Sequence, residues 1–350
     1  MAGDLVLITG ATGHLGYRTL RFALEYGYTV RAVVRSEAKA DKVRDSAALK
    51  AMKNEAKLSF VVIPDFLVPG AFDEAVRDVK YIIHVASPLA TKVPDGADLD
   101  EWFVKPAVQG TVAVLESAKK AGTVQRIVIT SSVASIMPLG ALLQSVDATF
   151  SAESRLPDMQ GPFAVSFVAY AASKIAAFNK AEAWVKAERP PFDVIHIHPT
   201  FVLGRDDLTD SVAYFQSNVN KFVVNQATGN VDPEFHSVPN NYNHVDDSAR
   251  IHVLSLEPKV AGNQSFIVSN NGQDGMTWDD TNAIIAKRYP EEVKNGTFPN
   301  SGTYQTVIGK LDIKKTEETF GFRLANWEDC VTSVLDHYLE VLLEEQQGGK

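Results

Sequence analysis

A chain of 350 residues with 45% hydrophobic and 22% charged residues has the composition of a folded globular protein, which excludes an intrinsically disordered one. Its formal net charge of −9 argues against a nucleic-acid partner, because such a partner requires a basic surface. No apolar run approaches the ~20 residues that cross a bilayer, no secretory signal is recognisable, and the lone Cys330 cannot form an internal disulfide. We therefore expect a cytoplasmic protein that binds neither nucleic acid nor membrane.

Short β-branched runs alternate with longer helical patterns over the first 200 residues. Strands that are apolar along nearly their whole length and are separated by helices indicate a parallel sheet covered on both faces. The sequence thus predicts an α/β fold with a doubly wound, Rossmann-type sheet. The predicted strands are Leu5–Thr9, Thr29–Val34, Leu58–Ile63, Tyr81–Val85, Arg126–Thr130 and Asp193–His198, and the predicted helices are Leu15–Tyr26, Ala71–Arg77, Trp102–Ala121 and Tyr170–Glu188.

The alternation weakens after Pro199, where polar residues become frequent. A helix over Val245–Leu256 and a strand over Ser265–Val268 are expected to return to the sheet, and helices over Trp278–Arg288 and Trp327–Leu343 should follow. We expect residues 1–200 to form the Rossmann domain, with residues 243–270 returning to it. Residues 201–350 should then form most of a smaller substrate-binding lobe.

Three glycines, Gly10, Gly13 and Gly16, lie between the first predicted strand and the first predicted helix. Gly10 allows a tight turn, Gly13 lets the backbone reach a pyrophosphate, and Gly16 lets helix and strand pack closely. The start of the helix adds amide groups and partial positive charge. This context predicts a dinucleotide site in preference to a purely structural turn. The predicted contacts come from the whole loop, namely Gly10, Ala11, Thr12, Gly13, His14, Leu15 and Gly16.

The second predicted strand ends without an acidic residue, and Arg35 follows it. In this fold an acid at that place binds the ribose hydroxyl of NAD, whereas an arginine accommodates the 2′-phosphate of NADP. Arg35 as a solvated residue at a helix start is the alternative. We expect NADPH or NADP+ as the cofactor, which makes residues 1–200 the NADP-binding domain.

Tyr170 and Lys174 are four residues apart in a helical pattern, so both side chains share one helix face. A phenol with a pKa near 10 is a poor acid–base group at neutral pH, and a nearby ammonium is expected to lower that pKa. Lysine can also hydrogen-bond the nicotinamide ribose. A surface pair is the alternative, but the upstream glycine loop favours a catalytic pair.

Ser131 and Ser132 follow the predicted strand Arg126–Thr130, and ligands bind at the carboxyl ends of strands in such sheets. A hydroxyl there can hold a substrate oxygen while it is protonated. Successive residues of a strand face opposite ways, so only one of the two serines points into the site. The residues alone leave the choice open.

Several segments occur in an order that resembles the dihydroflavonol-reductase-like branch of the extended short-chain dehydrogenases/reductases, which includes fungal and yeast methylglyoxal, ketone and aldehyde reductases. They are His84-Val85-Ala86-Ser87-Pro88, Thr130-Ser131-Ser132, Tyr170-x-x-x-Lys174, His198-Pro199-Thr200-x-Val202-x-Gly204 and His244-Val245-Asp246-Asp247. The motifs cover roughly residues 5 to 257, beginning with the loop Gly-x-x-Gly-x-x-Gly.

The resemblance implies a carbonyl reductase in which Ser132, Tyr170 and Lys174 are catalytic. It implies further cofactor contacts from the carboxyl ends of several strands, in addition to those of Tyr170 and Lys174. These contacts are Asp65 and Phe66 beside the adenine, Val85, Ala86, Ser87 and Thr130 along the cofactor, and Pro199, Thr200 and Val202 at the nicotinamide.

Met137 departs from the pattern, because dihydroflavonol reductases usually carry an amide residue there, five positions after the catalytic serine. We therefore expect a small-molecule aldehyde or ketone as substrate instead of a flavonoid. Sugar-nucleotide epimerase or dehydratase activity with bound NAD and a non-catalytic NADP-sensing module are the alternatives. The expected substrate pocket comprises Ser87, Val133, Met137, Phe167, Phe201 and Tyr214.

Other polar pairs receive structural interpretations. His196 and His198 lie on one predicted strand without a third ligand nearby in the sequence, so we expect core or cofactor-adjacent histidines and no metal. Asp246-Asp247 should start a helix, with one carboxylate capping it, and Asp206-Asp207 should lie in a solvated loop. We expect a monomer or a homodimer.

Overall fold

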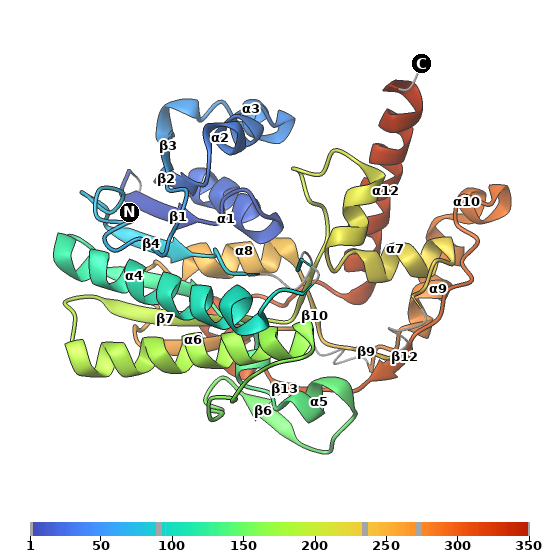
Figure 1. Ribbon diagram of the computed structural model, residues 1–350. Coiled ribbons are helices and arrows are strands. Elements are labelled where there is room, and N and C mark those ends of the chain that lie inside the picture. Colours follow the sequence, from blue (N-terminus) through green and yellow to red (C-terminus); the bar gives the residue numbers. More distant parts are fainter. Residues whose placement is uncertain (1–2, 89–92, 95, 233–236, 271–274, 349–350) are drawn as a thin grey trace.

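The protein is represented by a computed structural model, which describes residues 3–88, 93–94, 96–232, 237–270 and 275–348. A sheet of seven parallel strands forms its centre, in the order β11-β7-β5-β4-β1-β2-β3 (Figure 1). The order runs outward in both directions from β1, so the predicted doubly wound α/β fold is confirmed. The strands are β1 (Leu5–Thr9), β2 (Thr29–Val34), β3 (Leu58–Val62), β4 (Tyr81–His84), β5 (Arg126–Thr130), β7 (Asp193–Pro199) and β11 (Gln264–Val268).

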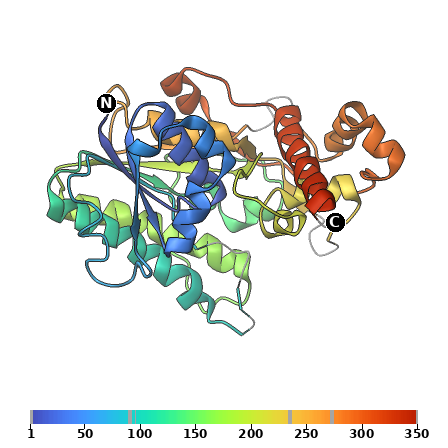
Figure 2. The ribbon, with the colours of Figure 1, turned by 90° about the horizontal axis from the view of Figure 1, so that it is seen from above.

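Helices cover both faces of this sheet. On one face α1 (His14–Glu25) packs against α8 (Val245–Leu254), and on the other α4 (Lys105–Ala121) packs against α6 (Ser166–Glu188), as Figures 1 and 2 show. The apolar side chains of the strands are divided between two core clusters, one beneath each pair of helices. Short helices α2 (Glu37–Arg44) and α3 (Ala47–Met52) follow β2, and a π-helical turn (Asp100–Val104) precedes α4.

The remaining elements lie mostly at the carboxyl ends of the central strands. A third apolar cluster around Trp278, Phe298 and Val331 joins several of the helices there. The cluster takes residues from α7 (Lys221–Thr228), α9 (Asp279–Arg288), α10 (Pro290–Asn295) and α12 (Trp327–Gly348). The other helices are α5 (Leu139–Leu143) and α11 (Lys314–Phe320), and 3-10 turns lie at Glu55–Lys57, Val133–Ser135 and Val212–Ser217. Strand pairs join β6 (Thr149–Ser151) to β13 (Lys310–Asp312), β8 (Phe201–Leu203) to β10 (Tyr242–His244), and β9 (Ser237–Pro239) to β12 (Gln305–Val307).

The division into domains at residue 200 stays a prediction, although β11 does lie in the central sheet. Within the described part of the chain, every helix is too short or too polar to span a bilayer. The same residues contain no group of side chains suited to holding a metal ion, and His196 and His198 are buried as expected.

One predicted helix is absent. Residues 71–77 form successive turns between two left-handed positions, Gly70 at φ +74° and Asp78 at φ +62°. These turns still bury Phe72 and Val76 against the core, which is why the segment has a helix-like apolar spacing.

Two interpretations of acidic pairs were also wrong. His244 caps α8 by accepting a hydrogen bond from the backbone N–H of Asp246, so neither Asp246 nor Asp247 is the cap. Asp206 is buried and the side chain of Asp207 is only 6% exposed, so this pair is not solvated. Asp207 lies among the guanidinium groups of Arg18, Arg21 and Arg205, which are far away in the sequence and supply the charge that allows its burial.

Candidate active site

The glycine loop between β1 and α1 has the geometry that a dinucleotide requires. Gly10 adopts φ +74°, and a Cβ atom on Gly10 would lie 2.8 Å from the backbone nitrogen of Ala86. A Cβ atom on Gly16 would lie 2.0 Å from the carbonyl oxygen of Gly10, so only glycine lets α1 approach β1 this closely. Gly13 is the N-cap of α1, and no acidic residue occupies the first turn of that helix. The loop therefore fits a pyrophosphate at the helix N-terminus.

Of the remaining loop residues, Ala11 is buried and Thr12 and Leu15 are partly buried. The Nε2 atom of the His14 imidazole lies 3.1 Å from the carbonyl oxygen of Arg205.

Arg35 follows the last residue of β2 and is exposed. Among the described residues it makes no ion pair, whereas Lys42 on α2 pairs with Asp210 at 2.8 Å. An unpaired guanidinium beyond β2, with no acid beside it, is the arrangement that suits a 2′-phosphate. Asp65 accepts a hydrogen bond from the backbone N–H of Leu67 at 2.8 Å and so shapes the turn that follows β3.

The other residues expected to contact the cofactor differ in their packing and hydrogen bonding. Phe66 packs against Phe72 with 5.0 Å between ring centroids, and Val85 is partly buried against the core. Thr200 donates hydrogen bonds to the carbonyl oxygen of Val268 from both its backbone nitrogen and its hydroxyl. Pro199 ends β7, and Val202 lies in β8 opposite Asn243 of β10.

Tyr170 and Lys174 lie one turn apart on α6, and the ammonium nitrogen of Lys174 is 5.7 Å from the centroid of the Tyr170 ring. The Lys174 side chain is buried, and among the described residues no carboxylate pairs with it. Burial lowers the pKa of Lys174 to about 8. A buried ammonium without a counter-ion is costly for the fold, and such groups are concentrated at functional sites.

The Tyr170 phenol faces the hydroxyl of Ser132. We expected Lys174 to lower the pKa of Tyr170, but that prediction is wrong for this structure. Burial raises the pKa of the phenol above its ordinary value of 10.0, and the Ser132 hydroxyl only partly offsets that effect. The phenol therefore keeps its proton at neutral pH, as a proton donor must.

The two serines after β5 face different surroundings. Ser132 begins the 3-10 turn Val133–Ser135, and its hydroxyl oxygen accepts a hydrogen bond from the backbone N–H of Ala134 at 3.2 Å. The hydroxyl of Ser131 instead lies 2.9 Å from that of Ser135 in the interior. Geometry thus separates Ser132, beside Tyr170, from Ser131, where the residues alone left the choice open.

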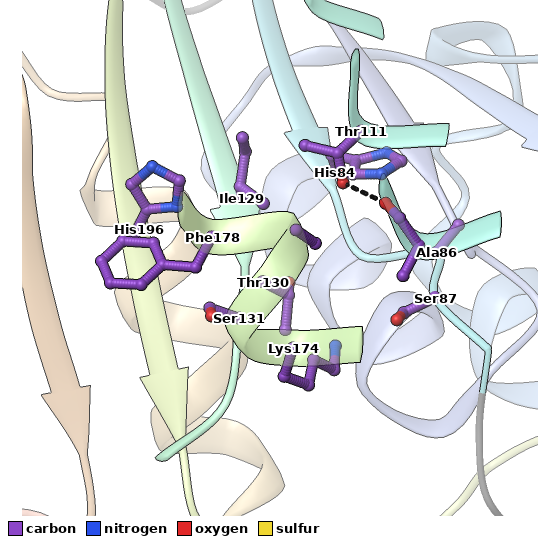
Figure 3. Close-up of a pocket in the computed structure, with 12 residues that line it drawn as sticks. His84, Ala86, Ser87, Thr111, Ile129, Thr130, Ser131, Lys174, Phe178 and His196 are labelled. Atoms are coloured by element: carbon purple, nitrogen blue, oxygen red, sulfur yellow. Dashed lines mark hydrogen bonds between the residues drawn. The ribbon is translucent and has the colours of Figure 1, made fainter. Parts of the chain in front are cut away.

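A cavity of about 20 Å³ lies beside Lys174, which lines it together with Ser87, Thr130 and Ser131 (Figure 3). Such a volume has room for about one water molecule. Sequence reasoning gave no role to several other lining residues. Phe178 could have been found from its position four residues after Lys174 on the same helix, and His84 from the motif His84-Val85-Ala86-Ser87-Pro88 that it begins, whereas Thr111 carries no such signal.

The expected substrate-pocket residues fall into two groups. Val133, Met137 and Phe167 belong to one apolar cluster with Tyr170, in which Phe167 stacks on Tyr170 at 6.5 Å and Met137 is fully buried, whereas Ser87 lines the small cavity beside Lys174. Two others lie elsewhere in the described structure. Phe201 stacks on Phe222 of α7. Burial of the Tyr214 ring, together with the nearby charges of Asp206 and Asp210, raises the pKa of Tyr214 to about 12.

A family model described as the NAD dependent epimerase/dehydratase family matches residues 6–269. The chain belongs to this family. Ketoreductase CTB6 of Cercospora nicotianae is 43% identical over 357 residues, which cover 99% of this chain and 98% of that protein. NAD-dependent epimerase/dehydratase ALT6 of Alternaria alternata is 33% identical, with coverage of 91% and 93%.

Among solved structures, yeast methylglyoxal/isovaleraldehyde reductase Gre2 complexed with NADPH matches with a TM-score of 0.80 at 26% identity. The match covers 96% of this chain and 98% of the yeast protein. The expected resemblance to the extended reductases, fungal ketone and yeast methylglyoxal reductases among them, is thereby confirmed. Within the epimerase/dehydratase family, these relatives support an oxidoreductase.

Proposed function

We propose that this protein reduces an aldehyde or a ketone to the alcohol with NADPH. The observation that carries the proposal is the buried Lys174, which lacks a carboxylate partner among the described residues and lies one helical turn from a protonated Tyr170 facing Ser132. A ketoreductase that is 43% identical along the whole chain and a yeast reductase structure that contains NADPH support both the reaction class and the cofactor.

The cofactor would lie across the carboxyl ends of the central strands, held at three places. The amides of the loop Gly10–Gly16 and the start of α1 would bind the pyrophosphate, Arg35 would bind the 2′-phosphate, and Asp65 and Phe66 would flank the adenine. The remaining contacts would come from Val85, Ala86, Ser87, Thr130, Tyr170, Lys174, Pro199, Thr200 and Val202.

When bound, NADPH supplies the hydride that reduces the carbonyl carbon. Ser132 donates a hydrogen bond to the substrate oxygen, since its own oxygen already accepts from Ala134 and its proton is directed to the side of the Tyr170 phenol. Tyr170 transfers its proton to that oxygen as negative charge develops there. The ammonium of Lys174 stabilises the phenolate that remains and hydrogen-bonds the nicotinamide ribose.

An apolar wall near Tyr170 favours a carbonyl compound without strongly polar groups beside the reacting carbon. Val133, Met137 and Phe167 form this wall, and it has no amide at the position where a flavonoid-binding residue would lie. We therefore propose an aldehyde or a ketone of low polarity in preference to a flavonoid.

The test is the variant Tyr170→Phe, compared with Tyr26→Phe as a matched control at an exposed tyrosine on the far end of α1. NADPH oxidation over a panel of aldehydes, diketones, ketoesters and flavanones measures turnover, and quenching of protein fluorescence measures NADPH binding. Tyr170→Phe should still bind NADPH and lose at least about 100-fold in kcat, the contribution expected of a proton donor. Turnover close to wild type in this variant would refute the mechanism.

Assays on the same purified protein also test two alternative functions. Some members of this family are named epimerases or dehydratases. Purified protein that retains NAD tightly and turns over no carbonyl compound would favour that chemistry. NADPH binding without turnover of any compound in the panel would favour a non-catalytic sensor.

A further inference from the structure

The carbonyl oxygen of Ser132 is held by three donors. The backbone N–H of Ser135 donates to it at 2.9 Å and the Ser135 hydroxyl donates at 2.6 Å. The third donor is the Nδ1 atom of His198 on β7, at 3.2 Å. A carbonyl has only two lone pairs, so this peptide is more heavily constrained than an ordinary turn requires.

The direction of each hydrogen bond in this group follows from the chemistry of the atoms. A carbonyl oxygen can only accept, so the bond from His198 places the proton on Nδ1, and the bond from Ser135 uses the hydroxyl proton of that residue. The single Nδ1 proton of His198 is shared between that carbonyl oxygen and the Ser135 oxygen, which lies 3.0 Å from Nδ1 and also accepts from the hydroxyl of Ser131 at 2.9 Å. Every donor in this group therefore acts, directly or through Ser135, on the peptide of Ser132.

His198 is fully buried and is held by more than its hydrogen bonds. Its ring lies edge-on to Phe178 with 4.9 Å between centroids, and its Nε2 atom has no partner among the described residues. Burial lowers the pKa of His198 to about 3, so the ring stays neutral at every working pH. The neutral His198 ring can therefore hold the Ser132 carbonyl in place by a hydrogen bond, but it does not take part in proton transfer.

We propose that His198 and Ser135 are positioning residues that orient the Ser132 hydroxyl toward the substrate and Tyr170. The inference rests on the proposed function, because it assigns Ser132 to the substrate oxygen. The Ser132 carbonyl starts the 3-10 turn Val133–Ser135, and that turn presents the Ala134 N–H to the Ser132 hydroxyl oxygen. The carbonyl oxygen and the hydroxyl oxygen of Ser132 are thus both held in place, and the hydroxyl proton is directed toward Tyr170 and the substrate.

The test compares two substitutions of the same imidazole. His198→Leu removes the donor, whereas the amide of His198→Asn can place an N–H where Nδ1 was. Both leave a void, so both should lower Tm to a similar extent. His198→Leu should lower kcat at least about tenfold with NADPH affinity little changed, since small misplacements of a reacting group are costly, and His198→Asn should recover most of that loss. Equal losses of kcat in the two variants would overturn the inference.

His196→Leu is the matched control. His196 lies two residues earlier on β7, contacts Phe178 at 4.8 Å, is similarly buried and makes no hydrogen bond to the Ser132 peptide. This variant should lower Tm as His198→Leu does but reduce kcat less. If His198→Leu does not fold, Ser135→Ala carries the same prediction, because it removes a single buried oxygen from the group.

A double-mutant cycle shows whether His198 acts through Ser132. In a Ser132→Ala background, His198→Leu should cause no further loss of kcat, whereas a general structural role would lower kcat by the same factor in both backgrounds. Large losses in Tyr170→Phe and Ser132→Ala with none in His198→Leu would overturn this inference alone. Full activity in Ser132→Ala would overturn both the inference and the role that the proposed function gives to Ser132.

Discussion

Gly16→Ala is the most direct perturbation of the expected cofactor site. The added Cβ atom would lie 2.0 Å from the Gly10 carbonyl oxygen, 2.6 Å from the Gly10 carbonyl carbon and 3.2 Å from the Ala11 nitrogen. Carbon and oxygen atoms in contact stay above about 3 Å, so α1 and the loop must separate by about 1 Å. All three neighbours are backbone atoms, and no side chain can rotate away to relieve the contact.

We expect this separation to weaken NADPH binding by at least tenfold, because the amides that hold the pyrophosphate move with the loop. The free energy of unfolding should fall by about 1–3 kcal/mol, the usual cost of overpacking, less the small gain from removing a helical glycine. Fluorescence titration with NADPH and a thermal melt measure the two effects.

Gly110→Ala is the matched control, since Gly110 lies within α4 and an added Cβ atom there would meet no atom within 4 Å. That variant should leave NADPH affinity unchanged and raise the free energy of unfolding by about 0.5–1 kcal/mol, the cost of a glycine in a helix. If Gly16→Ala bound NADPH as tightly as the wild type, the cofactor would not lie on this loop and the site would have to be placed elsewhere.

Three further predictions follow from the charges in the structure. With the pKa of Lys174 lowered to about 8, that residue is charged below pH 8, so kcat/KM for reduction should be level near neutrality and fall above pH 8; a rise there would contradict its role. Burial raises the pKa of Asp247 from 3.8 to about 6, so its contribution to stability is present below pH 4 and lost as the pH passes 6. In melts at pH 7, Asp247→Asn should therefore stabilise the fold by about 1–3 kcal/mol, and at pH 4 it should give no gain. Asp246→Asn should instead destabilise the fold, because it breaks the ion pair with Arg18. Arg35→Ser should weaken NADPH binding about 10- to 100-fold, leave NADH binding unchanged and keep Tm constant; equal losses for both cofactors would refute the 2′-phosphate assignment.

The central sheet could be predicted well because its strands carry their own signal. Leu5–Thr9, Thr29–Val34 and Arg126–Thr130 are short runs rich in β-branched residues, and the structure places strands at the same bounds. Residues 71–77 show the limit of this reasoning. A helix and a series of turns can bury the same two residues, and the left-handed conformation of Asp78 that ends the segment has no marker in the sequence.

In the candidate site, too, features formed by residues close in the sequence could be predicted, whereas features formed by distant residues could not. Tyr170 and Lys174 share one helix, so their spacing was enough to place them together, and the glycine loop is equally local. The buried ion pairs of Asp207 could not be predicted, because Arg18 and Arg21 are nearly two hundred residues away and only the folded chain brings them together. The surroundings that raise the pKa of Tyr170 are also a property of the packed structure.

The choice between Ser131 and Ser132 connects these two kinds of information. Alternation along a strand requires that only one of them faces the site, but it does not say which. The structure directs Ser131 toward Ser135 and leaves Ser132 beside the phenol. Ser131 therefore belongs to the hydrogen-bonded group that holds the Ser132 peptide. Its hydroxyl donates to the Ser135 oxygen, because the Ser135 proton is already donated to the Ser132 carbonyl. Two adjacent hydroxyls with identical chemistry thus acquire different roles from the direction of one hydrogen bond each.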